Sequence, residues 1–329
     1  MPITLKDIAK VCNVSYSTVS RAINNKNIRP SAKMDEIRET AKALGYSPNV
    51  LAVQLVKRRT KIIGLIIPDI ANPHYSEITK CVEDAALERG YQVFLCNSDW
   101  NIAKEKRYRD LLIEHRVAGM VVMPVSDESH ILFRNLDIPI VLLGSRTKER
   151  SLNTVVMDNH QAAFLATEYL IKKGCTKLAY IGRRIENYTS SDRIRGYKSA
   201  LQAYGIADQA ASLINSDSFQ LEGGYTATKK LLRQPNRLNG IIAFNDFIAI
   251  GAMQAVEEEG YIVGSDIAII GFDNVLYSAL PKISLTTVTP SNEELAKKAV
   301  AIIISYVEEN EKEVQHLLLP PKLIFRSTC

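Results

Sequence analysis

The chain has 329 residues, of which 46% are hydrophobic and 23% are charged, the composition of a globular protein with room for two or three domains. No apolar run approaches the roughly 20 residues of a membrane-spanning helix, and the N-terminus lacks the basic-then-apolar layout of a signal peptide. The five cysteines are scattered without Cys-x-x-Cys spacing, which excludes an obvious disulfide framework or zinc site and favours reduced thiols in a cytoplasm.

The positive charge is concentrated at the N-terminal end. Residues 1–61 hold twelve lysines and arginines against four acids, a net charge of +8, whereas the remainder has 29 basic and 32 acidic residues, a net charge of −3. A basic N-terminal segment attached to a slightly acidic remainder indicates that only the N-terminal segment binds a polyanion.

Two short helices joined by a tight turn are predicted near the start of the chain. The first has apolar residues at the i, i+3, i+4, i+7 spacing of a buried face, namely Leu5, Ile8, Ala9 and Cys12. A turn at Asn13-Val14 leads to Ser15, a good N-cap for the second helix. Its inward face carries Val19 and Ile23, which leaves an outer face of Tyr16, Ser17, Ser20 and Arg21.

A third helix is predicted from Pro30-Ser31 onward, because a buried stripe follows and Gly45 ends it. The stripe consists of Met34, Ile37, Ala41 and Leu44. The three helices alone are compatible with a small core whose charged side chains are merely solvated. A small polar face on the second helix, together with the charge excess, favours insertion of that helix into a DNA major groove.

The chain resembles the lactose/galactose repressor (LacI/GalR) family of bacterial transcription regulators over essentially its whole length. The motifs that carry the resemblance are Thr4–Asn24, Gly45-Tyr46-Ser47-Pro48-Asn49, Ile66-Ile67-Pro68-Asp69 and Ile270-Gly271-Phe272-Asp273-Asn274. It implies an all-α helix-turn-helix headpiece in residues 1–47, a hinge in 48–61 and an effector-binding and dimerisation domain in 62–329.

By this resemblance, Tyr16, Ser17 and Arg21 lie where the recognition helix touches base edges. A bidentate contact of Arg21 with guanine is worth about 1–3 kcal/mol of discrimination. Ser17 is shorter than the amide of some relatives, so the operator sequence stays open. The expected DNA-binding residues, including polar side chains that contact the DNA backbone, are Thr4, Tyr16, Ser17, Thr18, Ser20, Arg21, Asn24, Tyr46, Asn49 and Leu55.

The segment after the headpiece is predicted to be a conditional helix. Asn49 can cap a helix from Ala52 to Lys57, which is too short to be stable alone and would form against a partner hinge and DNA. In the family a hinge leucine wedges into the minor groove, and Leu55 occupies that position. The alternative is a solvated linker.

Beyond residue 61, short apolar runs alternate with amphipathic helical stretches. The expected strands are Ile62–Pro68, Gln92–Asn97, Ala118–Pro124 and Pro139–Gly144 in a first series, then Lys177–Gly182, Gly240–Asn245 and Ile267–Asp273 in a second. Repeated βα units of this kind imply parallel sheets with helices on both faces. The body is therefore predicted to be α/β and periplasmic-binding-protein-like, with two doubly wound parallel-sheet subdomains.

Later segments are expected to cross back between the two subdomains. They are Ser284–Pro290, Ser291–Val307 and Leu317–Arg326. The N-subdomain would comprise about 62–159 with 290–316, and the C-subdomain about 160–289 with 317–329. A ligand would bind between them, at the carboxyl ends of the strands.

The resemblance places six residues in an effector site: His74, Tyr75, Arg193, Phe219, Asn245 and Asp273. Two more are expected there by position: Trp100 follows the second strand and could stack on a sugar face, and Thr189 lies near Arg193 in the sequence. Arg193 is the strongest candidate, because its planar fork suits vicinal hydroxyls or a carboxylate. Each kind of side chain also has a purely structural alternative: an ion pair for Arg193, a loop cap for Asp273, and ordinary packing for the aromatic residues.

One departure from the family bears on the ligand. Many relatives have an aspartate five residues after the proline that begins the fourth strand, but here Pro139 leads to Gly144. The lost acceptor and three nearby arginines leave a phosphorylated or acidic sugar open beside a neutral one. These arginines, which could equally be solvated at loop tips, are Arg146, Arg183 and Arg184.

The sequence favours a transcription regulator, most often a repressor, whose operator affinity is controlled by a sugar, sugar phosphate or related metabolite. Two headpieces must reach two half-sites about one helical turn apart, which requires at least a homodimer. The lack of a C-terminal heptad tail favours a dimer over a tetramer. The sign of the effect stays open, since an effector can loosen or tighten operator binding.

Two other classes of function fit the sequence less well. A sugar carrier without a DNA role would fit the body, but not the basic head or the missing signal peptide. An α/β enzyme is disfavoured because the chain has no GxGxxG after a strand, no Walker loop, no GxSxG elbow and no metal-spaced His/Cys cluster. No cofactor, metal or membrane partner is expected.

Overall fold

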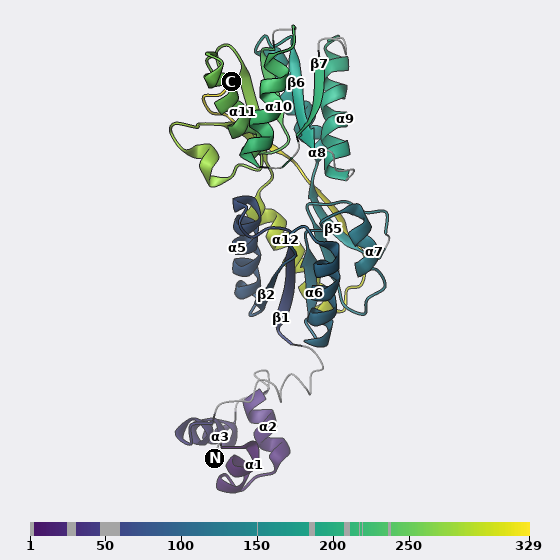
Figure 1. The fold of residues 1–329 in the computed structure, drawn as a ribbon. Helices are drawn as coiled ribbons and strands as arrows, with labels where there is room; N and C mark the ends of the chain where they lie inside the picture. Colours follow the sequence, from purple (N-terminus) through teal and green to yellow (C-terminus); the bar gives the residue numbers. More distant parts are fainter. Residues whose placement is uncertain are drawn as a thin grey trace. The chain divides into compact units, whose positions relative to one another are not determined.

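The computed structural model describes residues 3–24, 31–46, 60–149, 151–183, 188–206, 211–216, 218, 220–235 and 238–329. The chain divides into two compact units, Met1–Arg59 and Thr60–Cys329. Figure 1 shows a helical N-terminal unit and a larger α/β unit. The predicted hinge helix, with Asn49 and Leu55, lies outside the described residues.

The described part of the N-terminal unit contains three helices: α1 (Leu5–Val11), α2 (Tyr16–Asn24) and α3 (Ala32–Ala43). Their core contains Ile8, Val19 and Ile37, none of which has any exposed surface. The predicted place of Leu44 in that core is wrong, since this side chain is 36% exposed. Helix α3 ends one residue earlier, and Gly45 at φ +68° turns the chain so that Tyr46 packs against the core instead.

Side-chain caps fix where the first two helices begin. Thr4 and Asp7 form a capping box at the start of α1, in which the Thr4 hydroxyl donates to Asp7 Oδ2 over 2.6 Å. This bond lowers the pKa of the Asp7 carboxyl. Ser15 caps α2 as predicted, since its Oγ accepts from the Thr18 backbone N–H at 3.2 Å.

The first lobe of the larger unit is built on a six-stranded sheet of order β11-β5-β4-β3-β1-β2, in which all pairings are parallel. Its strands are β1 (Ile62–Ile67), β2 (Gln92–Asn97), β3 (Gly119–Val122), β4 (Ile140–Leu143), β5 (Asn153–Met157) and β11 (His316–Leu319). Alternate residues of β1 face opposite ways: Leu65 joins the core under α5 (Pro73–Glu88) and α12 (Asn292–Ile304), while Ile66 joins the core under α6 (Ile102–Glu114). The remaining short elements are η1 (Asp127–Ser129), α7 (His130–Phe133) and η4 (Ser305–Glu309).

The second lobe repeats this architecture around a sheet of order β12-β10-β9-β8-β6-β7, in which only the β10–β12 pairing is antiparallel. Its strands are β6 (Leu178–Arg183), β7 (Ala211–Ser216), β8 (Gly240–Ala243), β9 (Ala268–Phe272), β10 (Thr286–Thr289) and β12 (Lys322–Ile324). Its helices are α8 (Asn159–Lys172), α9 (Tyr188–Ala203), α10 (Leu221–Leu232), α11 (Asp246–Glu258) and the short η3 (Leu276–Ala279). Helices α10 and α11 approach so closely that a Cβ at Gly251 would lie 1.9 Å from the Leu221 carbonyl oxygen.

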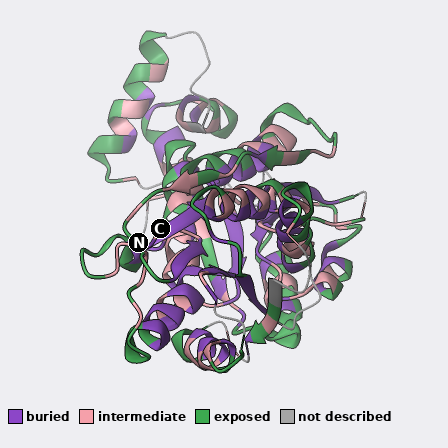
Figure 2. Cartoon of the chain, turned by 90° about the horizontal axis from the view of Figure 1, so that it is seen from above, coloured by how far each residue is buried: buried purple, intermediate pink, exposed green. Residues whose placement is uncertain are grey.

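The two lobes are discontinuous in sequence. The chain leaves the first sheet after β5, returns to it at α12 and leaves again after β11. The chain crosses from the first lobe to the second for the last time at 320–321, whereas the sequence analysis expected this boundary between residues 316 and 317. The reason is that His316–Leu319 pairs with β5 and Lys322–Ile324 pairs with β10. Figure 2 shows that the central strands of the sheets are buried, whereas the edge strands β2, β11 and β12 carry exposed residues. No helix among the described residues is long and apolar enough to cross a membrane.

Candidate functional sites

The outer face of α2 is the candidate DNA-binding surface. Val19 and Ala22 anchor the opposite face of this helix in the core. Tyr16, Ser17 and Arg21 are exposed, and Thr18 and Ser20 are half-buried. Arg21 is therefore exposed on a packed helix, and among the described residues no hydrogen bond or ion pair of its guanidinium is seen.

Other residues predicted to contact DNA have different surroundings. Thr4 is exposed, but its hydroxyl is engaged in the α1 capping box. Tyr46 packs against the headpiece core, and burial raises the pKa of its phenol. The side chain of Asn24, together with Asn49 and Leu55, lies outside the described residues.

A cavity of about 130 Å³ lies between the two lobes of the larger unit, where loops follow the carboxyl ends of their strands. A dry cavity of roughly 150 Å³ holds one benzene molecule, so this space suits a ligand built on one ring. Seven of the eight predicted effector residues line it: His74, Tyr75, Trp100, Thr189, Arg193, Asn245 and Asp273. Phe219 lies outside the described residues.

Arg193 is a cavity residue whose guanidinium is held in place by several contacts. Helix α9 places it among other side chains, with 5% of its surface exposed. Its Nε donates to Asn159 Oδ1 over 2.8 Å, and its Nη1 donates to the Phe244 carbonyl oxygen. The guanidinium carbon lies 4.1 Å from the centre of the Phe272 ring. A guanidinium has five N–H bonds, so donors remain for a molecule in the cavity.

Asp273 faces Arg193 from the loop after β9. Its Oδ1 lies 3.9 Å from Arg193 Nη2 and 4.0 Å from His74 Nδ1, which comes from the other lobe. The residue adopts φ 100°, a left-handed backbone conformation that non-glycine residues rarely take. Its backbone is fixed by an N–H bond to Val288 O and by the Thr289 hydroxyl, which donates to Asp273 O.

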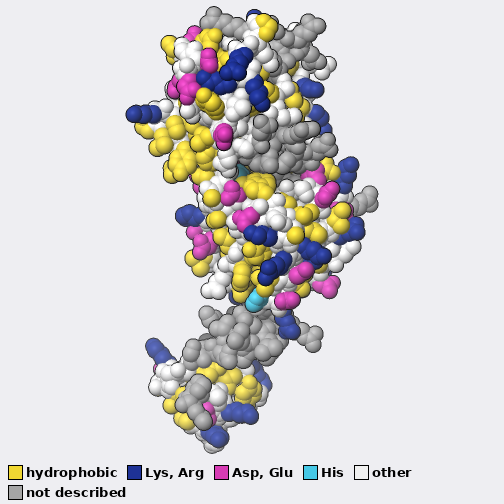
Figure 3. Space-filling model, in the orientation of Figure 1, with side chains coloured by type: hydrophobic (Ala, Val, Ile, Leu, Met, Phe, Trp, Pro, Cys, Tyr) yellow, Lys and Arg dark blue, Asp and Glu magenta, His cyan; other side chains and the backbone are white. Residues whose placement is uncertain are grey.

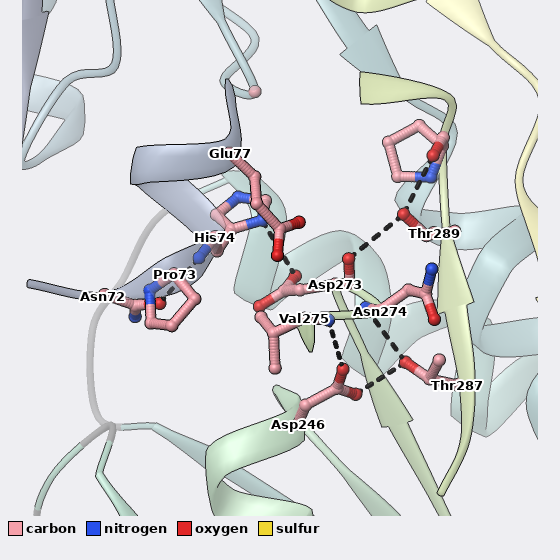
Figure 4. A network of polar contacts seen from close by, with 12 residues as sticks. Asn72, Pro73, His74, Glu77, Asp246, Asp273, Asn274, Val275, Thr287 and Thr289 are labelled. Atoms are coloured by element: carbon pink, nitrogen blue, oxygen red, sulfur yellow. Dashed lines mark hydrogen bonds and ion pairs between the residues drawn. The ribbon is translucent and has the colours of Figure 1, made fainter. Parts of the chain in front are cut away.

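Asp246 holds this loop from below, as Figure 4 shows. Its Oδ1 accepts from the Thr287 hydroxyl at 2.6 Å, and its Oδ2 accepts from the Val275 backbone N–H at 2.9 Å. The residue has no exposed surface, and burial, reinforced by the nearby Asp273 charge, raises its pKa well above the ordinary value. Asp246 is therefore a positioning residue for Asp273, which the sequence analysis did not identify.

Aromatic rings form one wall of the cavity. Tyr75 and Trp100 meet edge to face with ring centres 5.9 Å apart, and His74 packs against Tyr75 at 5.1 Å. Trp100 adopts a φ of 57° and is 36% exposed. Part of its side-chain surface is therefore not covered by packing. Aromatic faces of this kind stack on the apolar face of a ring-shaped ligand.

A second group of contacts joins the lobes around the start of α9. The Thr189 hydroxyl donates to the Gly144 carbonyl oxygen over 3.2 Å, and the rings of Tyr188 and His130 stack at 6.4 Å. Arg146 forms an ion pair with Asp192 of α9 at 2.6 Å. Arg146 is not among the residues that line the cavity. The side chain of Arg183 and all of Arg184 lie outside the described residues.

The arrangement suits the binding of a polar ring compound. Hydrogen-bonding groups from both lobes converge on a space with an aromatic wall, which is the usual composition of a small-molecule site. Among the described residues, no group of three or more His, Cys, Asp or Glu side chains could hold a metal ion.

Comparison with known proteins decides the family. The model of bacterial regulatory proteins of the lacI family matches residues 4–49, and that of the periplasmic binding protein-like domain matches residues 167–329. The regulator RegA of Clostridium saccharobutylicum is 32% identical over 331 residues, covering 100% of this chain and 99% of the relative. The chain belongs to the lacI family.

A second relative supports this assignment, and a solved structure shows the same fold. The ribose operon repressor of Halalkalibacterium halodurans is 32% identical, over 99% of this chain and 96% of the relative. The lac repressor dimer, solved with operator and the anti-inducer ONPF, has a TM-score of 0.84 and 24% identity, covering 100% of this chain and 99% of that chain. This lacI-family chain is a DNA-binding transcription regulator, so the alternative of a sugar carrier without a DNA role is rejected. The two curated relatives are named as regulators, not as enzymes.

Several cavity residues of this lacI-family chain were missed by the sequence analysis. They are Asn72, Ser126, Asp127, Ser145 and Asn159. Each stands within a few residues after a strand or at the start of a helix, where polar residues are also common as caps. The position after a strand was therefore the only available signal, and it did not separate ligand contacts from caps.

Proposed function

We propose that this protein is a repressor that binds operator DNA as a homodimer, and that a small polyhydroxyl compound, a sugar or a sugar derivative, controls its operator affinity. The observation that carries the effector part is the interlobe cavity, which combines the Arg193–Asp273 pair with an aromatic wall. The name of the relative from H. halodurans, a ribose operon repressor, supports a sugar.

The cavity supports control of DNA binding through movement of the lobes. A ligand would contact His74 and Tyr75 from one lobe and Arg193 and Asp273 from the other. A ligand that binds one arrangement of the lobes more tightly shifts the population toward it. Coupling of this kind is typically worth about 1–3 kcal/mol, a five- to 150-fold change in operator affinity.

An exposed apolar patch supports the homodimer. It lies on the segment that follows β9, where Leu276 is 70% exposed, Tyr277 44% and Leu280 45%. Hydrophobic side chains gather over this part of the second lobe in Figure 3. Contiguous apolar patches of this kind mark interaction sites, and a two-fold dimer would bring two headpieces to a palindromic operator.

A selection experiment tests the proposal. Full-length protein is mixed with sheared chromosomal DNA from its host, with and without a panel of monosaccharides, and the captured fragments are sequenced. We expect enrichment of a palindromic site with half-sites about one helical turn apart, and a change of recovery with one sugar. No enrichment under any condition would refute the DNA-binding function, whereas enrichment that no sugar alters would refute the sugar effector.

Arg21 is proposed to read a base directly. Arg21→Ala should lower operator affinity about ten- to 100-fold, since one bidentate contact contributes roughly 1–3 kcal/mol of discrimination, and should leave binding to random DNA nearly unchanged. Competition gel shifts with operator and random duplexes measure both affinities. Lys33→Ala is the control, because Lys33 is exposed on α3 and paired with Glu36. Equal losses on both duplexes would assign Arg21 to backbone contact.

A further inference from the structure

Asp127 stands out among the residues that line the cavity. It follows β3 in the first lobe and begins the short helix η1. Its Oδ1 is buried and has no hydrogen-bond partner among the described residues. Burial raises the pKa of this carboxyl, while a hydrogen bond from the Tyr188 backbone N–H acts in the opposite direction. Buried carboxylate oxygens normally accept hydrogen bonds, so this oxygen calls for a donor.

The loop that carries Asp127 is held in place from beneath. Glu105 of α6 has no exposed surface, and its Oε1 accepts from the Val125 backbone N–H at 3.3 Å. Burial raises the pKa of Glu105 to about 7. A capping box between Ser126 and Ser129 closes η1 on the other side. The Asp127 carboxylate therefore sits on a supported turn, which is how a selective binding site fixes its groups.

The cations around the cavity are engaged with other acids. Arg146 and Arg195 both lie 2.6 Å from Asp192, and Arg193 faces Asp273. Among the ion pairs of the described residues, none includes Asp127. Apart from His74, the ionisable acids and bases that line the cavity are Asp127 and Asp273 against Arg193, so carboxylates outnumber guanidinium groups there.

On the basis of the proposed function, we propose that Asp127 accepts a hydrogen bond from a hydroxyl of the effector and that the cavity selects uncharged polyhydroxyl compounds against their phosphorylated or carboxylated derivatives. A hydroxyl supplies the donor that Oδ1 lacks. A phosphate or carboxylate brings acceptors and a like charge close to Asp127 in a partly desolvated space, where repulsion is strong. The loop after β3 thus supplies a hydrogen-bond acceptor to the cavity. It does so even though the loop after β4 has Gly144, which has no side chain, at the position where many relatives have an aspartate.

The ligand preference of the unaltered full-length protein is the first test. Thermal shift is measured with ribose, glucose and galactose, and with ribose 5-phosphate, glucose 6-phosphate and glucuronate. A ligand that binds the folded state raises the melting temperature. We expect stabilisation by a neutral sugar and at least tenfold weaker binding of its anionic derivative. Tighter binding of a phosphate or uronate would overturn the inference but leave the sugar effector standing. No stabilisation by any compound would overturn the proposed sugar effector, and the inference with it.

Asp127→Asn tests the residue itself, by titration calorimetry with the preferred sugar. The dissociation constant should rise at least tenfold, because hydrogen bonds to charged groups are the stronger ones. The ratio of dissociation constants between anionic and neutral ligand should fall at least fivefold, an effect that a merely structural role would not produce. Glu128→Gln is the matched control, since Glu128 is the exposed neighbour and does not line the cavity. An unchanged dissociation constant and ratio in Asp127→Asn would overturn the assignment.

Discussion

Removal of residues 1–59 should abolish operator binding and leave effector binding intact. These residues form a compact unit of their own, with a core built from Ile8, Val19 and Ile37. Residues 1–59 hold eleven lysines and arginines against four acids, a net charge of +7, and phosphate neutralisation provides most of the non-specific affinity for DNA. We expect operator affinity to fall more than 1000-fold in a gel shift, the range by which specific binding exceeds non-specific binding.

The remaining unit should still fold and bind ligand, because its lobes have separate hydrophobic cores on both faces of each sheet. The control is a thermal-shift titration of residues 60–329 with the sugar that stabilises the full chain. Its dissociation constant should agree with that of the full chain within about twofold, because no DNA is present in this titration and the coupling between the two sites acts only when DNA is bound. Loss of both activities would show that the two units are not separable.

The sequence predicted the parts of the fold that depend on local pattern. Strands such as β1 and β9 are continuous apolar runs buried on both faces, which is the signature of a parallel sheet. Strand β5 was missed because it begins with Asn153 and Thr154, which look like loop residues. The Asn153 side chain bonds to Ile140 O and to the Gln315 N–H. These partners are distant in sequence, so no local pattern reveals that Asn153 is buried in a sheet.

The same limit applies to the candidate cavity. The strand-end positions of Asn245 and Asp273 are visible in the sequence, and the resemblance to the family added Arg193. Asp246 was passed over because an acid in the first turn of a helix is usually a solvated residue that favours the helix dipole. Its role depends on Val275 and Thr287, which reach it from two other segments. Residues that act through long-range contacts therefore needed the three-dimensional structure.

Arg193→Ala should remove the effector response while leaving the operator affinity of the ligand-free protein nearly unchanged. The substitution deletes the cavity cation and leaves Asp273 without its charge partner at 3.9 Å. Hydrogen bonds to charged groups are worth about 1.5–3 kcal/mol each, so loss of two contacts predicts at least a 100-fold weaker effector. Titration calorimetry measures the affinity, and gel shifts with and without the effector measure the response.

A structural role for Arg193 is separable from a ligand role. Its bonds to Asn159 and to Phe244 O join α9 to the segments after β5 and β8, so some loss of stability is expected as well. Arg195→Ala is the matched control, because Arg195 lies on the same helix, pairs with Asp192 and has a side chain that is 63% exposed. It should bind effector normally. Arg193→Lys keeps the charge but lacks the planar fork, so it should restore stability more than affinity. A normal effector response in Arg193→Ala would remove this residue from the binding site and leave it as an ion pair between segments of the second lobe.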